Sequence, residues 1–331
     1  MDKETGKAVL ADGKEITAST TFTPEKSEGS VDVIFTFDAS IVAPKTVVAF
    51  ETLTYKKIQI AVHADIEDKD QTVYIPTIRT SAKDNVTGIN HTEADKEVTI
   101  TDTVTYKGLE VGREYTVSGT LMNQRTGAKI LVNGKPVTAS TTFTAEEKEG
   151  SVEVVFAFDA SALEGTTTVV YEKLYTENKE VAAHTDINDK GQTIYIPKVR
   201  TTAIADDTKD HVTKAQKDVT IVDTVSYEGL EVGREYTVKG VFMNKATGET
   251  ITINGEEVTA ESTFTAKAQK GTVDVTFKFD GSALEDTLIV VFETLYTEGK
   301  EVGVHAEIED DAQTVYIPKI QTEAKDAVTE I

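Results

Sequence analysis

Five polar residue types recur at fixed spacing in this sequence, and together they could carry out an acyl transfer. A hydroxyl attacks an acyl group when a base takes its proton, and a side-chain amide is an acyl donor whose leaving group is ammonia. The sequence therefore describes a reaction in which a Thr of the protein attacks a Gln of the same protein. The two complete sets are Thr80, Asp102, Glu172, His184 and Gln192, and Thr201, Asp223, Glu293, His305 and Gln313.

Alternation along the predicted strands places these polar groups on apolar faces. Side chains two residues apart share a face of a strand, and Glu172 lies between Val170 and Leu174. By the same parity the Thr, the Asp and the Gln of each set also point inward. Burying two carboxylates and an amide costs on the order of several kcal/mol unless the groups satisfy one another. We therefore expect the four side chains to meet in the core.

The expected proton chemistry follows from bringing two carboxylates together. They cannot both stay ionised, so one pKa should rise and the pair should share a proton. The ionised member is then a base for the Thr hydroxyl, and the protonated member can stabilise the oxyanion that forms on the amide. His184 and His305 each lie eight residues before their Gln. They are placed to supply or relay a proton to the departing ammonia.

These sets belong to a longer repeat with a period of 121 residues. Gln71, Gln192 and Gln313 each begin the same segment, Q-T-[VI]-Y-I-P. The period predicts two complete modules at 77–197 and 198–318, a truncated module at 1–76 that lacks its first strands, and the first strand of a further, absent module at 319–331. We number them from the N-terminus, so that module 1 is 1–76, module 2 is 77–197 and module 3 is 198–318.

Module 1 and the last segment carry incomplete sets. Module 1 has Glu51, His63 and Gln71 but no Thr or Asp partner, so no bond is expected there. Thr322 has no Gln of its own. Pairing of Thr322 with Gln71 of another chain would still lack the Asp, so we do not expect it.

Within a module the pattern is that of β-strands. Val152–Phe158 reads V-E-V-V-F-A-F, with β-branched or aromatic residues at every second position, and turn pairs such as Asn133-Gly134 separate the strands. Several such strands in about 120 residues predict an all-β fold of tandem immunoglobulin-like antiparallel β-sandwiches. Modules 2 and 3 join through Ile196–Arg200, which is too short for a flexible linker, so we expect a rod-like array.

The amino-acid composition limits the kinds of molecule to which the chain could bind and the chemistry it could carry out. The chain has 331 residues, with 34 Lys+Arg against 57 Asp+Glu and a net charge of −23. This charge argues against nucleic acid and anionic membranes as main partners. No apolar run is long enough for a membrane span. The absence of Cys excludes disulfides, thiolate nucleophiles and Cys-ligated metals.

The motifs around the five residues resemble those of the VaFE-repeat, or Thr–Gln ester-bond, domains of Gram-positive cell-surface adhesins. The resemblance covers nearly the whole chain. The matched motifs are R-T-[ST] at Thr80 and Thr201, D-T-x-x-Y-x-G-L at Asp102 and Asp223, V-x-F-E at Glu293 with Tyr171 replacing Phe before Glu172, and H-x-[DE] followed by Q-T at His184 with Gln192 and at His305 with Gln313.

The resemblance implies that Thr and Gln form an autocatalytic intramolecular ester between the first and last strands. The modules would then form the stalk of an extracellular, cell-wall-anchored adhesin, whose signal peptide and sorting motif this chain does not contain. Such a chain would act once on itself and would not be an enzyme toward outside substrates. We expect a monomer without cofactor or metal, whose partners are neighbouring modules, with a host ligand bound at a tip domain outside this chain.

Two other classes remain open from the sequence. One is a β-sandwich crosslinked by a Lys–Asn isopeptide, although Gln occupies the closing-strand position where Asn would be needed. The other is a set of uncrosslinked repeats that bind a host protein or glycan through exposed loops such as Asn133–Lys135. The acidic run 186–191 lacks the ligand pattern of a calcium loop and is interpreted as a solvated turn. His91 and His211 do not align with each other and are predicted to be surface residues.

Overall fold

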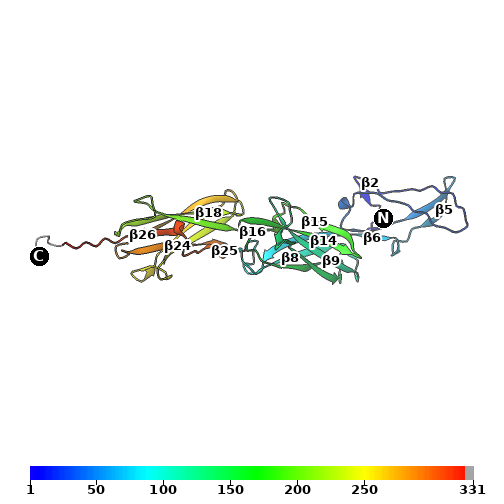
Figure 1. The fold of residues 1–331 in the computed structure, drawn as a ribbon. Helices are drawn as coiled ribbons and strands as arrows, with labels where there is room; N and C mark the ends of the chain where they lie inside the picture. Colours follow the sequence, from blue (N-terminus) through cyan, green and yellow to red (C-terminus); the bar gives the residue numbers. More distant parts are fainter. Residues whose placement is uncertain (325–331) are drawn as a thin grey trace.

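A computed structural model describes residues 1–324 and contains three β units in a row (Figure 1). Almost all regular structure is antiparallel β-strand, interrupted by three short 3₁₀ turns. The predicted all-β array of tandem β-sandwiches is confirmed. Among residues 1–324, no helix is long and apolar enough to cross a membrane.

Module 2 is a sandwich of two antiparallel sheets. The larger sheet has the order β12-β9-β14-β15, with β16 also pairing with β14, and the smaller has the order β13-β8-β7. The first strand of the module therefore lies in one sheet and the last in the other. The strands are β7 (Thr77–Asp84), β8 (Val98–Lys107), β9 (Glu114–Asn123), β10 (Leu131–Val132), β11 (Lys135–Pro136), β12 (Thr138–Thr144), β13 (Glu149–Phe158), β14 (Thr166–Thr176), β15 (Lys179–His184) and β16 (Thr193–Ile196), with the 3₁₀ turn η2 at Lys190–Gln192.

The core between the sheets forms because the strands alternate with a period of two. In β8 the buried positions are Val98, Ile100, Asp102, Val104 and Tyr106, and the intervening Thr residues point outward. β-branched residues suit this pleated, half-buried surface. Asp102 is thus carried into the core by its apolar neighbours on the same face.

Module 3 repeats this arrangement. Its larger sheet is β22-β19-β24-β25 with β26 on β24, and its smaller sheet is β17-β18-β23. The strands are β17 (Lys198–Ala205), β18 (Val219–Glu228), β19 (Glu235–Asn244), β20 (Thr252–Ile253), β21 (Glu256–Glu257), β22 (Thr259–Thr265), β23 (Lys270–Phe279), β24 (Thr287–Thr297), β25 (Lys300–His305) and β26 (Thr314–Ile317), with η3 at Asp311–Gln313.

Module 1 has fewer paired strands. Strand β3 pairs with β6, β4 pairs with β5, and β1 pairs with β2, while the smaller sheet of the other modules has no counterpart among the described residues. As a result Leu53 of β4 is 43% exposed, whereas its counterparts Leu174 and Leu295 are fully buried. The elements are β1 (Leu10–Ala11), β2 (Lys14–Glu15), η1 (Ala39–Ile41), β3 (Lys45–Val48), β4 (Glu51–Tyr55), β5 (Ile58–His63) and β6 (Thr72–Ile75).

Two expectations from the sequence meet a different outcome. Residues 319–324 belong to no strand, and the rest of the strand expected at 319–331 lies outside the described residues.

The prediction that His91 is a surface residue is wrong, because its side chain is 0% exposed. His91 packs against Tyr236 of module 3, so its burial depends on the next module. His211 is half-buried, with Nδ1 3.2 Å from the Thr314 carbonyl oxygen.

Candidate functional site

The two sheets of module 2 bring the five residues together across the core. Thr80 lies on β7 and Asp102 on the adjacent β8, where Asp102 pairs with Ala82. Glu172 lies on β14 in the opposite sheet, directly across from His184 on β15. Gln192 ends the turn η2 that leads into β16. First-strand and last-strand side chains therefore face each other inside the sandwich.

In module 2 one oxygen of Glu172 holds both reacting groups. The Thr80 hydroxyl donates to Glu172 Oε2 at 3.4 Å, and the Gln192 amide nitrogen donates to the same oxygen at 2.7 Å. Asp102, Glu172 and Gln192 are fully buried, and Thr80 is half-buried. The alternation of side chains along the strands predicted that these groups face the core.

In module 3 the Thr and the Gln touch directly. The Gln313 amide nitrogen donates to Thr201 Oγ1 at 2.9 Å and to Glu293 Oε2 at 2.8 Å. It also donates to the Val291 carbonyl oxygen at 2.6 Å. The nucleophile and the acyl donor are thus in contact before any reaction.

Burial sets the protonation of the carboxyl pairs. It raises the pKa of Glu172 and of Glu293 to about 11, and the neighbouring Asp adds to the rise in each case. Burial also raises the pKa of Asp102 and Asp223, while the nearby Glu and Thr side chains act in the opposite direction. At neutral pH the Glu of each pair is therefore protonated and is the group that could act as an acid.

Several buried atoms of module 2 have no hydrogen-bond partner among the described residues. Four of them lie in the candidate site, namely Glu172 Oε1, Gln192 Oε1 and both carboxylate oxygens of Asp102. A proton shared between the two carboxyl groups would satisfy one oxygen of each. The ends of the Gln amide exchange by rotation about its last bond, which would place its carbonyl oxygen against the acidic Glu172. In that orientation the acid polarises the bond that the hydroxyl attacks.

The His of each set is held by an Asp that the sequence reasoning missed. His184 Nε2 lies 3.0 Å from Asp189 Oδ2, and His305 Nε2 lies 3.4 Å from Asp310 Oδ2. Asp189 also caps η2 by accepting from the Gly191 amide at 2.7 Å. A signal was present in the sequence, since an Asp stands three residues before each Gln at the end of its module.

These His side chains are suited to proton relay. The Nδ1 atoms of His184 and His305 are buried and have no hydrogen-bond partner among residues 1–324. Burial lowers the pKa of His305, so it is neutral at pH 7 and free to accept a proton. In that same part of the chain, no group of three or more His, Asp or Glu is arranged to hold a metal ion.

The incomplete set is only partly assembled. The Gln71 amide nitrogen donates to Glu51 Oε2 at 2.5 Å, and His63 Nε2 lies 2.9 Å from Asp68. The His63 side chain is 54% exposed, whereas its counterparts are largely buried. Thr322 is exposed, belongs to no strand, and is not brought to the other three.

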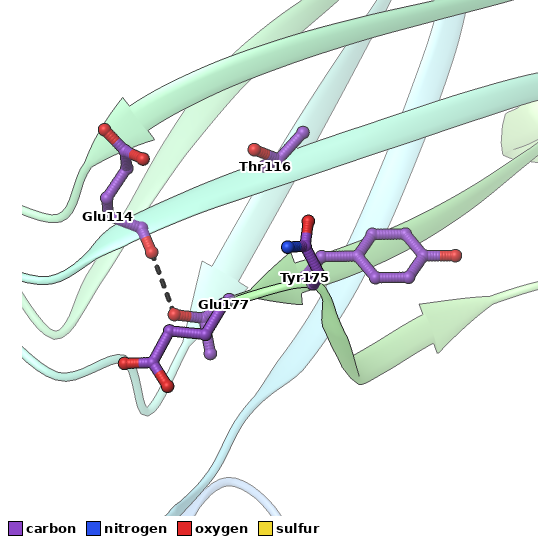
Figure 2. Close-up of a pocket in the computed structure, with 6 residues that line it drawn as sticks. Glu114, Thr116, Tyr175 and Glu177 are labelled. Atoms are coloured by element: carbon purple, nitrogen blue, oxygen red, sulfur yellow. Dashed lines mark hydrogen bonds between the residues drawn. The ribbon is translucent and has the colours of Figure 1, made fainter.

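One surface pocket of module 2 lies apart from the candidate site. Figure 2 shows a pocket at one end of the larger sheet of module 2, lined by Glu114, Thr116, Tyr175 and Glu177 among others. The dashed line there is the bond from the Thr176 hydroxyl to the Glu114 carbonyl oxygen, at 3.0 Å. None of the acyl-transfer residues lines this pocket, so the candidate site is the sandwich core itself.

Comparison with known families assigns the chain. The model of the T-Q ester bond containing domain matches three times, over residues 1–75, 76–196 and 197–317. The chain belongs to this family. The resemblance drawn from the motifs is therefore confirmed, and the matches span all three modules.

Two solved structures show distant similarity to the chain. A bacterial adhesin from Mobiluncus mulieris, described as containing disulfide, isopeptide and ester bond cross-links, is 16% identical over 68% of this chain and 82% of that one, with a TM-score of 0.34. A glycosyl hydrolase family 2 member from Bacteroides cellulosilyticus is 15% identical over 62% of this chain and 28% of that one, with a TM-score of 0.27. Comparison with curated protein sequences finds no match. The assignment thus rests on the family model.

Proposed function

We propose that modules 2 and 3 each form an internal ester between the Thr of the first strand and the Gln of the last. The observation that carries the proposal is the contact of the Gln313 amide with Thr201 Oγ1 at 2.9 Å, next to the acid Glu293. A nucleophile held against an acyl donor, with a base and an acid in place, has the geometry of intramolecular catalysis.

The first step is attack of the hydroxyl on the amide. Thr201 Oγ bonds to the side-chain carbonyl carbon of Gln313, and the hydroxyl proton passes to Asp223. Glu293 stabilises the oxyanion by donating its proton or a strong hydrogen bond. The fully buried site strengthens this interaction because water does not compete for it.

The second step expels ammonia. The oxyanion collapses to the ester carbonyl, the C–N bond breaks, and the nitrogen takes up a proton as it leaves. His305, held by Asp310, relays this proton to the leaving nitrogen. The products are one ester and one ammonia, so the balance requires no oxidant or cofactor. Each module catalyses this reaction once, on itself, and has no turnover on outside substrates.

The bond would protect the module against force. The ester from Thr80 to Gln192 closes a loop of 113 residues. Tension that enters at β7 and leaves at β16 would pass through the covalent link, so the strands between could not be extended. An ester would take the place of disulfides in this Cys-free chain.

We infer from this device and from the family that the chain is a stalk segment of a bacterial surface adhesin. It would act as a monomeric, protease-resistant and force-resistant spacer between the cell wall and a ligand-binding tip. The net charge of −23 supports extension, because like charges repel along the rod.

The test is the intact mass of the full chain under denaturing conditions. We expect a mass lower than that of the sequence by two ammonia molecules, one for each complete set. In Thr201→Ala the deficit should fall to one. A Thr201→Ala variant that keeps both losses would indicate another crosslink. An unchanged wild-type mass would contradict the proposal and favour uncrosslinked repeats that bind a host ligand.

A further inference from the structure

The contact between modules 2 and 3, here called the joint, contains a buried histidine outside the candidate site. His91 lies in the loop between β7 and β8, and its Nε2 is 2.7 Å from the Tyr236 hydroxyl of module 3. Its Nδ1 is 3.0 Å from Asn90 Oδ1. The imidazole also stacks on Tyr195, with ring centroids 4.8 Å apart. One side chain therefore connects the two modules.

The donors and acceptors around His91 fit a neutral imidazole. The Tyr236 hydroxyl accepts a hydrogen bond from the Glu231 amide at 2.9 Å, which leaves its own proton to donate to His91 Nε2. Nδ1–H then donates to Asn90. Burial, together with the positive charge of Arg234, lowers the pKa of His91 to about 3. A protonated imidazole would place a second donor against the Tyr236 hydroxyl and a charge in a buried site.

Two other contacts hold the surfaces of modules 2 and 3 close together at the joint. Arg200 of module 3 donates through both terminal nitrogens to the two Glu164 oxygens of module 2, at 2.8 and 2.7 Å. Gly229 has a φ of +79°, and a Cβ there would lie 2.9 Å from the Gly165 backbone. Backbone thus meets backbone, with no room for a side chain.

The same place in module 3 lacks this histidine. The repeat aligns His91 with Val212, which is 41% exposed. Modules 1 and 2 also meet through the loop that corresponds to the Gly229 loop, since a Cβ on Gly108 would lie 3.4 Å from Pro44. The docking loop therefore recurs in the repeat, whereas a His at the position of His91 does not recur in module 3.

We propose that neutral His91 locks module 2 to module 3, so that the two sandwiches move as one rigid body. The hydrogen bond to Tyr236 and the edge-on contact with its ring, at 5.8 Å between centroids, fix the angle between the modules. Stacking on Tyr195 of the same module holds the imidazole in place. This inference does not depend on the proposed ester, because no residue of the acyl-transfer sets contributes to the lock.

A second titratable contact in the joint, between Glu93 and Glu301, responds to pH in the direction opposite to that of His91. Burial, and after it the nearby Glu301 of module 3, raise the pKa of Glu93 to about 7, with Asp95 and Asp84 adding to the rise. Tyr296 also lies beside this contact, since Glu301 and Glu93 add to the rise that burial causes in its pKa. The docked state favours protonated Glu93, so this contact weakens as the pH rises from about 4.5 to about 7. The docked state favours neutral His91, so that contact weakens as the pH falls from about 6.5 to about 3.

The test measures the distance between the modules in the full chain. Because the chain has no Cys, spin labels can be attached at Val155→Cys and Thr276→Cys, which are exposed on matching strands. Pulsed electron paramagnetic resonance should give one narrow distance distribution for the wild-type background at pH 7. His91→Ala should broaden it, and His91→Phe, which keeps the ring contacts with Tyr195 and Tyr236 but loses the hydrogen bond, should broaden it less. The matched control Val212→Ala should leave it unchanged.

Either of two results would overturn the lock. One is an unchanged distribution in His91→Ala. The other is equal broadening in His91→Ala and Val212→Ala, which would indicate a general loss of structure. The melting temperature of each variant separates local loosening from unfolding, since loosening of the joint leaves both sandwiches folded.

A pH series tests the requirement for a neutral imidazole. In Glu93→Gln the opposing titration is gone, so the distribution should broaden as the pH is lowered from 7 to about 4.5. The double variant His91→Phe with Glu93→Gln should lose this response. A Glu93→Gln chain that stays equally narrow at both pH values would refute the dependence on protonation.

Discussion

Loss of the Thr201 hydroxyl gives the most direct measure of what the proposed ester contributes to stability. Thr201→Val keeps the shape of the side chain, which is 5% exposed and packs in the module 3 core. The hydroxyl can no longer bond to Gln313, so the loop of 113 residues between them opens in the unfolded chain. The chain-entropy relation used for disulfides gives a loss of about 5 kcal/mol for a loop of this length.

This free energy corresponds to a large change in melting temperature. For a unit of this size, each kcal/mol shifts the melting temperature by roughly 3–5 °C, so module 3 should melt about 15–25 °C lower. Calorimetry of the full chain should show one transition moving down while that of module 2 stays in place. Thr202→Val is the matched control, because Thr202 is the next residue on β17 and lies on the opposite face.

Two results would refute this reasoning. If Thr201→Val still lacked two ammonia molecules relative to the mass of its own sequence, Thr201 would not be the crosslinked residue. If the deficit fell to one ammonia but the transition moved no more than in Thr202→Val, loop closure would not be the source of stability. Measuring mass and melting on the same sample separates the two.

Three further predictions concern the carboxyl pairs and the packing around them. Asp102→Asn removes the base of module 2, so the mass deficit should fall from two ammonia molecules to one. In Thr201→Val the uncrosslinked module should lose stability as the pH rises. Folded Glu293 has its pKa raised to about 11, so its contribution is complete below about 4.5 and is lost progressively as the pH rises from there to about 11. Denaturant titrations at pH 7 and 9 should differ by about 2–3 kcal/mol, and equal values would contradict the assignment of Glu293 as the acid. Gly119→Ala would place a Cβ against the Phe156 ring and 3.1 Å from Glu172 Oε1. It should destabilise module 2 by about 1–3 kcal/mol and slow the loss of ammonia from module 2 in time-resolved mass measurements; an unchanged rate would show that Glu172 tolerates displacement.

Much of the candidate site could be predicted from the sequence, because the face to which a strand residue points depends only on its position relative to its neighbours in the strand. Glu172 between Val170 and Leu174 must face the same way as its neighbours, whatever the rest of the fold does. The repeat then added a second instance of each residue at the same spacing. The first and last strands of a sandwich module close on the same core, so these residues had to meet.

The partners of individual atoms required the tertiary structure. The sequence did not indicate that one Glu172 oxygen would accept from both Thr80 and Gln192, or that Asp189 would hold His184. Such contacts depend on the turn geometry of η2 and on the packing of two sheets, which no local pattern encodes.

The sequence by itself determined the repeat, the all-β class and the inward-facing polar set, since each follows from spacing along one strand or from one module to the next. Only the tertiary structure decided that His91 is buried. Its neighbour Tyr236 lies 145 residues away and in another module. Burial at a joint is a property of two surfaces brought together, and the alternation within either strand carries no information about it.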